Sequence, residues 1–433
     1  MWSSFLEQQC EADLRRPTAL PCLRGLLHMT GAPRAQALCA AVTLLTITTA
    51  IPAAEVFVQP GASITAEHDS NVELSPLAVN KQSATGYNAD ISTLIGIATP
   101  DSQTTLRPDL KYEYFPTDRS LNRLEGRLDL NTQFKWQRDK FTMLGRFDRR
   151  DDLNAEIADA VYNPVNPELP TPPGTGHVSL GIVRNDLLLL PDYSHSLTPL
   201  SNIGIAGTYE HLKYSPDDPF DHVEFNYYQA KPYYDYALSA RAQLSFGVFA
   251  SRYDAQNIVS RSTAYGTEMD MRYMWSPTWR GTLDLLYQQT TIDQTTPYVF
   301  HDKTNNWGAT IGLTYFGPAG QLRMNAGRNI LPSSGGALYN TDQVQLQYVR
   351  DVTQRLQFTG AVLYQRTGVL AANYVSDTRN YAITQLYLRW MVTRVWFVRG
   401  SYSYAWQRYT NDPASAQNNG ISVQIGYLGL PRQ

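Results

Sequence analysis

Three residue types that hydrolases combine for catalysis stand side by side at His68, Asp69 and Ser70. Neighbouring residues of an extended chain point to opposite faces, so this adjacency does not bring an imidazole, a carboxylate and a hydroxyl together. Asp69, Asn71 and Glu73 offer oxygen atoms of the kind that Ca²⁺ prefers, but an ordinary solvated loop is the simpler interpretation. We therefore expect neither catalysis nor a metal site in this stretch.

The remaining residues with chemical potential are scattered. The histidines have no metal-ligand spacing: His177, His195, His211, His222 and His301. The sequence contains no Gly-x-Ser-x-Gly motif and no glycine-rich phosphate loop. We expect no catalytic residue, no metal and no cofactor, so the protein is predicted not to be an enzyme. A lipid hydrolase or acyltransferase carried by a membrane barrel is the weaker alternative.

Charged residues recur at every second position in several segments, most clearly in residues 123–147. Along the first arm of this segment, Leu124, Leu128 and Phe134 alternate with charged or polar residues. Successive side chains of a strand point to opposite faces, so this arm has one apolar and one charged face. The pattern predicts a β-hairpin, and later segments repeat it.

The repetition predicts about eighteen strands, with sixteen as the alternative count. No run of 18 apolar residues occurs, which argues against membrane-spanning helices. The chain has 28 tyrosines and 8 tryptophans, and a transmembrane barrel uses such residues at its two interfaces. We predict an all-β protein, a closed antiparallel transmembrane β-barrel. A soluble propeller is the alternative, but it would require a fixed compact repeat.

Two kinds of connection separate the predicted strands. Short turns are flanked by aromatic residues: Trp136, Trp275, Trp279, Tyr348, Trp390 and Trp396. Longer polar loops are predicted at residues 69–86, 293–303, 331–337, 370–378 and 411–418, and a proline-rich irregular stretch follows Arg150. Short periplasmic turns and longer extracellular loops are typical of bacterial outer-membrane barrels.

The first 54 residues are predicted to be a targeting segment. An apolar stretch follows Arg34 and ends in Pro52, Ala53 and Ala54, which fits signal cleavage after Ala53 or Ala54. Residues 1–28 fit poorly in front of a signal peptide and are interpreted as an over-extended start. The barrel is assigned to residues 55–433, which contain no cysteine.

The charged faces of the strands are predicted to line the lumen. They carry both signs, and we expect most of them to pair in a structural network while an unpaired subset sets selectivity. The residues singled out as pore-lining are Arg107, Asp109, Lys111, Glu113, Arg123, Glu125, Arg127, Asp129, Arg280, Asp284, Arg323, Arg355 and Arg389.

The segment 58–72, with VQPGASIT followed by HDSNV, resembles the first strand and Asp-Asn turn of a family of outer-membrane β-barrel porins. These porins are associated with exopolysaccharide biosynthesis and exosortase (PEP-CTERM) loci. The tyrosine-rich hairpin around Ser276-Pro277-Thr278 is similar to theirs as well. The resemblance implies a barrel without catalytic residues that passes a polysaccharide.

The expected function is therefore an outer-membrane channel of a Gram-negative bacterium, for export of an exopolysaccharide. A general or solute-specific diffusion porin is one alternative, and a structural barrel with a plugged lumen is another. Expected partners are outer-membrane lipid, the barrel assembly machinery, and a polysaccharide with periplasmic export components. The net charge of −3 gives no indication of nucleic-acid binding.

Overall fold

The computed structural model describes residues 54–431 except 78–80, 163–174, 177, 180, 217–221, 257–259, 296–298, 371–377 and 413. The predicted signal segment, residues 1–54, lies outside the described residues except for its last residue. No helix in the described part of the chain is long and apolar enough to cross a membrane. The description below concerns the unit Glu55–Gln433.

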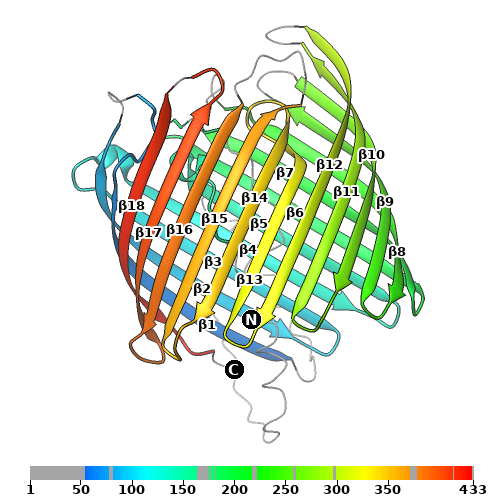
Figure 1. Ribbon diagram of the computed structural model, residues 1–433, viewed down its shortest axis with the longest axis horizontal. Coiled ribbons are helices and arrows are strands. Elements are labelled where there is room, and N and C mark those ends of the chain that lie inside the picture. Colours follow the sequence, from blue (N-terminus) through cyan, green and yellow to red (C-terminus); the bar gives the residue numbers. More distant parts are fainter. Residues whose placement is uncertain are drawn as a thin grey trace, which may run out of the picture. The chain divides into compact units, whose positions relative to one another are not determined.

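This unit is a single antiparallel sheet of 18 strands that closes on itself (Figure 1). The strands are β1 (Glu55–Asp69), β2 (Ala84–Ala98), β3 (Ser102–Tyr114), β4 (Arg123–Lys135), β5 (Asp139–Asp151), β6 (Val183–Thr198), β7 (Ser201–Ser215), β8 (Phe225–Ser239), β9 (Ala242–Ala255), β10 (Ser260–Met274), β11 (Trp279–Gln294), β12 (Phe300–Gly317), β13 (Gly320–Pro332), β14 (Leu338–Asp351), β15 (Leu356–Val369), β16 (Arg379–Met391), β17 (Trp396–Tyr409) and β18 (Ser415–Leu428).

Each strand pairs with its neighbours in sequence, and β1 pairs with β18 to close the ring. The closing register runs from Gly61 opposite Leu428 to Asp69 opposite Gly420. Beyond the last strand, the Gly429 N–H donates to the Pro60 carbonyl at 2.7 Å. Because all eighteen strands pair antiparallel and β1 pairs with β18, the prediction of a closed antiparallel barrel with eighteen strands is confirmed.

Three prolines inside strands interrupt the pairing on one side only. The β2–β3 register skips the position of Pro108, and the β6–β7 register skips that of Pro191. The β8–β9 register skips the position of Pro232, whereas the β7–β8 register is continuous there. Proline has no N–H to donate, so one ladder bond is lost where it would have pointed. The other neighbour still pairs at each proline.

The outer face of the ring is apolar, as the alternation predicts. Ile64 and Ile91 are 67% and 62% exposed, and Ile421, Val423 and Ile425 alternate along β18 with similar exposure. Their sequence neighbours face the lumen. Only a closed barrel satisfies every strand N–H and C=O within lipid without leaving an edge. The apolar exterior and charged interior together make this an outer-membrane β-barrel.

Aromatic side chains collect at the rim with the short turns. Trp136, Trp275, Trp390 and Trp396 are each about half exposed beside such turns. Trp396 also packs against Tyr427 with ring centroids 5.3 Å apart. This is the position of an interfacial belt, where an indole meets both hydrocarbon and water.

Some element boundaries differ from the prediction. Much of the predicted loops 293–303 and 411–418 is strand, because β11 extends to Gln294, β12 begins at Phe300 and β18 begins at Ser415. These polar ends lack an apolar face, and their pairing comes from backbone bonds to adjacent strands. A short helix α3 (Asp152–Glu156) and a 3₁₀ turn η3 (Arg119–Leu121) were not predicted.

The assignment of alternate β2 residues to lipid and lumen predicts which of them can be replaced by arginine. Ile91 lies in the middle of the strand and faces outward, so Ile91→Arg should cost roughly 2–4 kcal/mol of folding free energy because the charge meets hydrocarbon. Unfolding in urea, followed by the heat-modifiable shift on gels, measures this loss. The neighbour Ser92 faces the lumen, and Ser92→Arg is the matched control. Equal destabilisation by both substitutions would contradict the assignment.

Candidate functional site: the lumen and its plug

Oppositely charged side chains pair across the lumen face of β3 and β4. Glu113 is 2% exposed and forms ion pairs with both Lys111 and Arg123. On β4, the Arg127 guanidinium lies 2.9 Å from the Asp129 carboxylate. This side of the lumen is therefore a paired network, which fixes the wall more than it attracts mobile ions.

The structure places the predicted pore-lining residues as follows. Arg107, Asp109, Lys111, Glu113, Arg123, Glu125, Arg127 and Asp129 lie on the lumen face of β3 and β4, and Arg280, Asp284, Arg323 and Arg389 lie on the lumen face of β11, β13 and β16. Arg355 does not line the lumen. It is an exposed residue of the short turn between β14 and β15, because β14 ends at Asp351 and alternation stops there.

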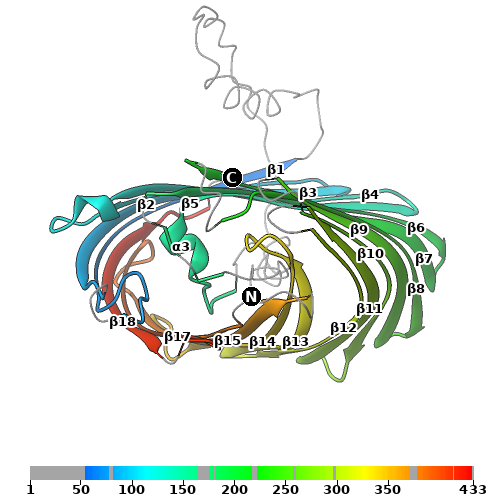
Figure 2. The same ribbon diagram turned by 90° about the horizontal axis from the view of Figure 1, so that it is seen from above.

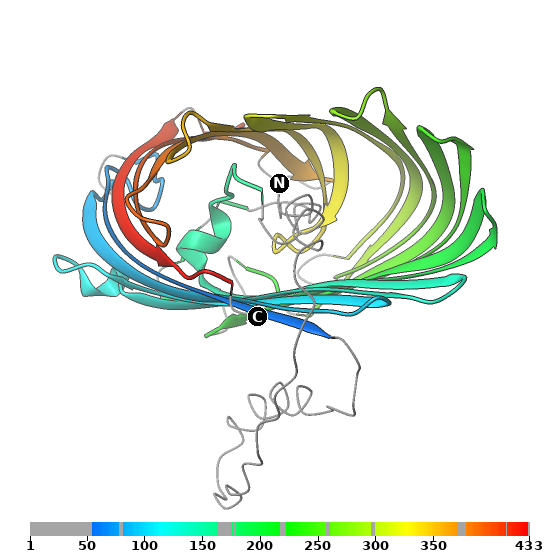
Figure 3. The ribbon, with the colours of Figure 1, turned by 90° about the horizontal axis from the view of Figure 1, so that it is seen from below.

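The described residues that follow β5, 152–162, fold into the lumen instead of leaving it. Figures 2 and 3 show α3 inside the ring of strands, close to the wall that includes β5. Asp151 caps this helix by accepting a hydrogen bond from the Leu153 N–H. Leu153 is 2% exposed and packs in a cluster with Phe115 and Leu121. We refer to the described residues 152–162 as the plug.

Charged groups hold the plug to the wall near its origin. The Asn154 side-chain amide donates to Glu125 Oε1 at 2.8 Å and to the Glu113 carboxylate at 3.3 Å. The Arg184 guanidinium of β6 donates to the Ala155 carbonyl at 3.2 Å. The charged wall residues thus satisfy backbone and amide groups of the plug as well as one another.

Amide, hydroxyl and guanidinium groups hold the plug to the opposite wall, β14 to β16, where the Arg379 guanidinium donates to the Glu156 carbonyl at 3.2 Å. Gln385 accepts a hydrogen bond from the Ala160 N–H, and Gln345 donates to the Ala160 carbonyl, both at 2.9 Å. The Tyr381 hydroxyl donates to the Ala158 carbonyl at 3.0 Å. The plug therefore bridges two walls of the barrel and narrows the lumen between them.

Tyr162 continues this contact along β13 and β14. Its N–H donates to Gln347 Oε1 at 2.8 Å, and the Arg323 guanidinium lies 5.9 Å from its ring centroid. Burial raises the pKa of the Tyr162 hydroxyl to about 12, so the phenol stays neutral at physiological pH. The predicted lumen residue Arg323 thus contacts the plug.

A second connection, residues 333–337 between β13 and β14, also packs inward. The Ser334 carbonyl accepts a hydrogen bond from the Val223 N–H at 2.8 Å, and the Ser333 carbonyl accepts one from the Tyr253 hydroxyl at 3.0 Å. Tyr253 and Val223 belong to a buried apolar cluster with Leu338. This loop fills the lumen beside β8 and β9.

A hollow of about 260 Å³ remains on the inner side of β5 to β13. Charged and polar groups line much of it, among them Arg146, Glu210, Gln229, Glu268 and Asp284. Lys231 lies 2.6 Å from Glu268 within the same wall. The hollow is a partly polar cavity on the lumen side of the barrel wall.

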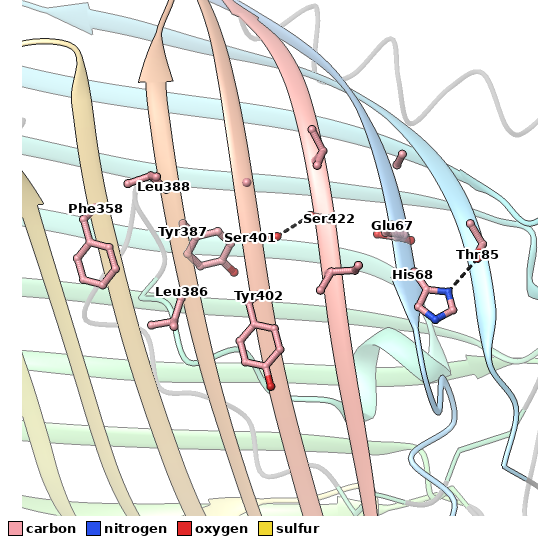
Figure 4. A pocket seen from close by; sticks show the side chains of 14 residues that line it. Glu67, His68, Thr85, Phe358, Leu386, Tyr387, Leu388, Ser401, Tyr402 and Ser422 are labelled. Carbon is pink, nitrogen blue, oxygen red and sulfur yellow. Dashed lines mark hydrogen bonds between the residues drawn. The ribbon is translucent and has the colours of Figure 1, made fainter.

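Another depression, of about 680 Å³, involves β1, β2 and β15 to β18 (Figure 4). Its lining includes Leu386, Leu388 and Tyr402, which belong to the exposed apolar exterior. A Cβ added at Gly400 would meet nothing within 4 Å, which explains the missing bulk. The depression is part of the lipid-facing surface, and a polar solute has little to bind there.

One cluster of potential metal ligands lies where the plug leaves the wall. Asp152, Glu156 and His222 bring their ligand atoms within 4.8 Å of one another, and all three are buried. Burial and the neighbouring Glu156 carboxylate raise the pKa of Asp152 to about 7. Sequence spacing did not reveal this cluster, because His222 lies 66 residues beyond Glu156. An Asp and a Glu four residues apart were its only local signal.

The other histidines that the structure describes stand apart from this cluster. His195 lies 2.8 Å from Asp139 near a short turn, and His301 lies 2.5 Å from Asp293 at the opposite rim. His211 contacts Asn226 at 2.8 Å, and His177 is outside the described residues. His68 contacts Thr85 at 2.9 Å on the outer face, so the His68–Ser70 stretch forms no triad.

No protein-family model and no curated protein matches the chain. Solved structures do resemble it in fold. OccK2 (OpdF) of Pseudomonas aeruginosa, in complex with glucuronate, is 11% identical over 87% of this chain and 99% of its own, with a TM-score of 0.43. OpdO of the same species is 9% identical over 88% and 98%, with a TM-score of 0.44. OccAB3 of Acinetobacter baumannii is 9% identical over 86% and 99%, with a TM-score of 0.42.

Proposed function

We propose that this protein is an outer-membrane diffusion channel for small polar solutes. The plug that bridges the lumen from α3 to β14–β16 carries this proposal. A barrel of this strand number has room for an aqueous channel, and a fixed segment across it reduces the passage to the size of small solutes. A route for a polymeric glycan would require the plug to move, whereas a diffusion channel requires it to stay.

Two arginines on the lumen face of β16 and β17 give the channel a preference for small anions. Arg389 on β16 lies directly opposite Arg399 on β17, and like charges in such a pair destabilise a sheet. Among the described residues, no carboxylate lies within 4.0 Å of either guanidinium. Glu268 and Asp284 line the hollow near β10 and β11. We infer a transverse field across the lumen and attraction of small anions to the β16–β17 side.

Reconstitution distinguishes diffusion from glycan export. Purified protein in liposomes should admit small sugars and organic anions at rates that fall steeply with solute size, measured by swelling. Deleting the gene should slow uptake of such solutes and leave surface polysaccharide intact. Loss of surface polysaccharide with unchanged small-solute uptake would instead support the exporter. An absence of conductance in planar bilayers would support a structural barrel.

The plug anchors predict a change in conductance. Gln345→Ala combined with Gln385→Ala removes the hydrogen bonds to Ala160, each worth about 1 kcal/mol net. The plug should then leave its position part of the time, and single-channel recordings should show larger or additional conductance levels. Gln424→Ala is the control, because Gln424 donates to Ser63 on the adjacent strand at 2.8 Å and not to the plug. Identical traces from both variants would contradict a constricting plug.

The arginine pair predicts selectivity. Replacing Arg389 and Arg399 by serine removes two positive charges from the lumen, so the reversal potential in a KCl gradient should shift toward cation preference. The shift should shrink at high salt, because ions screen the lumen charges. Replacing the exposed turn residue Arg355 by serine should leave the reversal potential nearly unchanged. A shift of the same size from Arg355→Ser would argue against the inferred field.

A further inference from the structure

The buried cluster of Asp152, Glu156 and His222 lies at the joint between the plug and the barrel wall. Asp152 and Glu156 begin and end α3, one helical turn apart, and so share a face of the helix. His222 comes from the connection between β7 and β8, and its Nε2 lies 3.2 Å from Asp152 Oδ2. The side chains of Asp152, His222 and Glu156 are fully buried. Two separate connections of the barrel therefore meet at this point.

One oxygen of each carboxylate is held by hydrogen bonds. The Ser179 N–H donates to Asp152 Oδ2 at 2.8 Å, and the Thr175 hydroxyl and Gly176 N–H donate to Glu156 Oε2 at 2.8 and 2.9 Å. Within the described residues, the second oxygens, Asp152 Oδ1 and Glu156 Oε1, are buried and accept no hydrogen bond. Leaving two buried acceptors unsatisfied in one cluster is costly. Each carboxylate is thus oriented through one oxygen, and its second oxygen accepts no hydrogen bond from the described residues, although Glu156 Oε1 lies 3.8 Å from the Arg184 guanidinium.

The positively charged side chains around the cluster leave Asp152 without a guanidinium or ammonium partner among the described residues. Neighbouring carboxylates each have a guanidinium partner: Asp186 with Arg146 at 2.8 Å, Asp148 with Arg150 at 2.5 Å and Glu156 with Arg184 at 3.8 Å. Among the described residues, no guanidinium or ammonium group lies within 4.0 Å of Asp152, whose basic neighbour is His222. A buried carboxylate without a matching charge is strongly disfavoured. A bound cation would supply that charge.

We propose that Asp152, Glu156 and His222 bind a divalent cation of the Zn²⁺ type. An imidazole together with two carboxylates suits zinc and similar first-row ions better than Ca²⁺ or Mg²⁺, which prefer oxygen ligands alone. Bonds of about 2.1 Å in a tetrahedral site place ligand atoms roughly 3.4 Å apart, close to the observed 3.2 Å between His222 and Asp152. The hydrogen bonds from Ser179 and Gly176 orient the carboxylates as outer-shell partners do.

Such an ion joins the plug to the β7–β8 connection. The plug begins at α3, so its start would be fixed by metal coordination in addition to the bonds from Asn154 and Arg184. The ion would bind the folded barrel and not the unfolded chain, and its stabilisation of the folded state would rise with the logarithm of its concentration once this exceeds the dissociation constant. This site is independent of which solute the channel passes.

The test measures zinc content and stability on the full barrel. Detergent-solubilised protein without a histidine tag is stripped with EDTA, dialysed against ZnCl₂ and washed, and metal is quantified by mass spectrometry. We expect one zinc per chain, and a higher unfolding temperature in Zn²⁺ than in EDTA. Asp152→Asn and His222→Gln, both close in size to the native side chains, should lower zinc affinity at least tenfold and abolish the temperature difference.

The matched control is a second His–Asp pair, His195 with Asp139, which has no second carboxylate ligand among the described residues. His195→Gln should retain one zinc per chain. The heat-modifiable gel shift verifies that each variant is folded, and Glu156→Gln serves as a third ligand variant if one fails to fold. Zinc that persists in the ligand variants, or a wild-type protein that binds none, would overturn the proposal and leave a buried ion pair.

Discussion

The whole structure depends on satisfying backbone hydrogen bonds inside the hydrocarbon of a membrane, which offers no hydrogen-bonding partners. Every N–H and C=O inside hydrocarbon must find a partner within the sheet, so the first and last strands have to meet. The β1–β18 register does this from Gly61 to Asp69, and the contact from Gly429 to Pro60 extends it by one bond. The same constraint explains the prolines. At Pro108, the pairing that fails toward β2 is retained toward β4, so each interruption is limited to one side.

Closure with eighteen strands fixes a lumen that is wider than side chains alone can fill. The chain fills part of it with its own connections, residues 152–162 and 333–337, and these need partners for their own backbone groups. The wall supplies them: Gln345 and Gln385 satisfy both polar groups of Ala160, and Tyr253 satisfies the Ser333 carbonyl. Polar residues on the lumen face thus stabilise the inward-folded segments, independently of any solute. The passage that remains is a consequence of how these segments are held.

The alternation of side chains made the barrel predictable, because successive residues of each strand face lipid and the lumen in turn and are therefore apolar and polar in turn. The same signal fails where both environments are aqueous. Residues 300–304 are strand although their sequence, FHDKT, has no consistent apolar face, since β12 extends past the lipid and is held by pairing with β11. Arg355 was assigned to the lumen because alternation was extended into a turn. The plug and the His222 cluster were not predictable, because they depend on contacts such as Tyr381 to Ala158 that join segments 223 residues apart.

The two sides of the plug are held by different chemistry, and this determines how each side responds to its surroundings. On β14 to β16 the contacts to Ala158 and Ala160 are neutral amides and a phenol, and two charged groups also take part: the Arg379 guanidinium donates to the Glu156 carbonyl, and Gln385 donates to the Asp159 carboxylate. Around α3 the contacts involve carboxylates and guanidiniums, and burial has raised the pKa of Asp152 to about 7. Burial therefore favours the neutral form of Asp152, whereas Ala160 has no ionisable side chain. The buried carboxylates of the plug are concentrated at α3, so pH and ion concentration act on the plug most directly at its first turn.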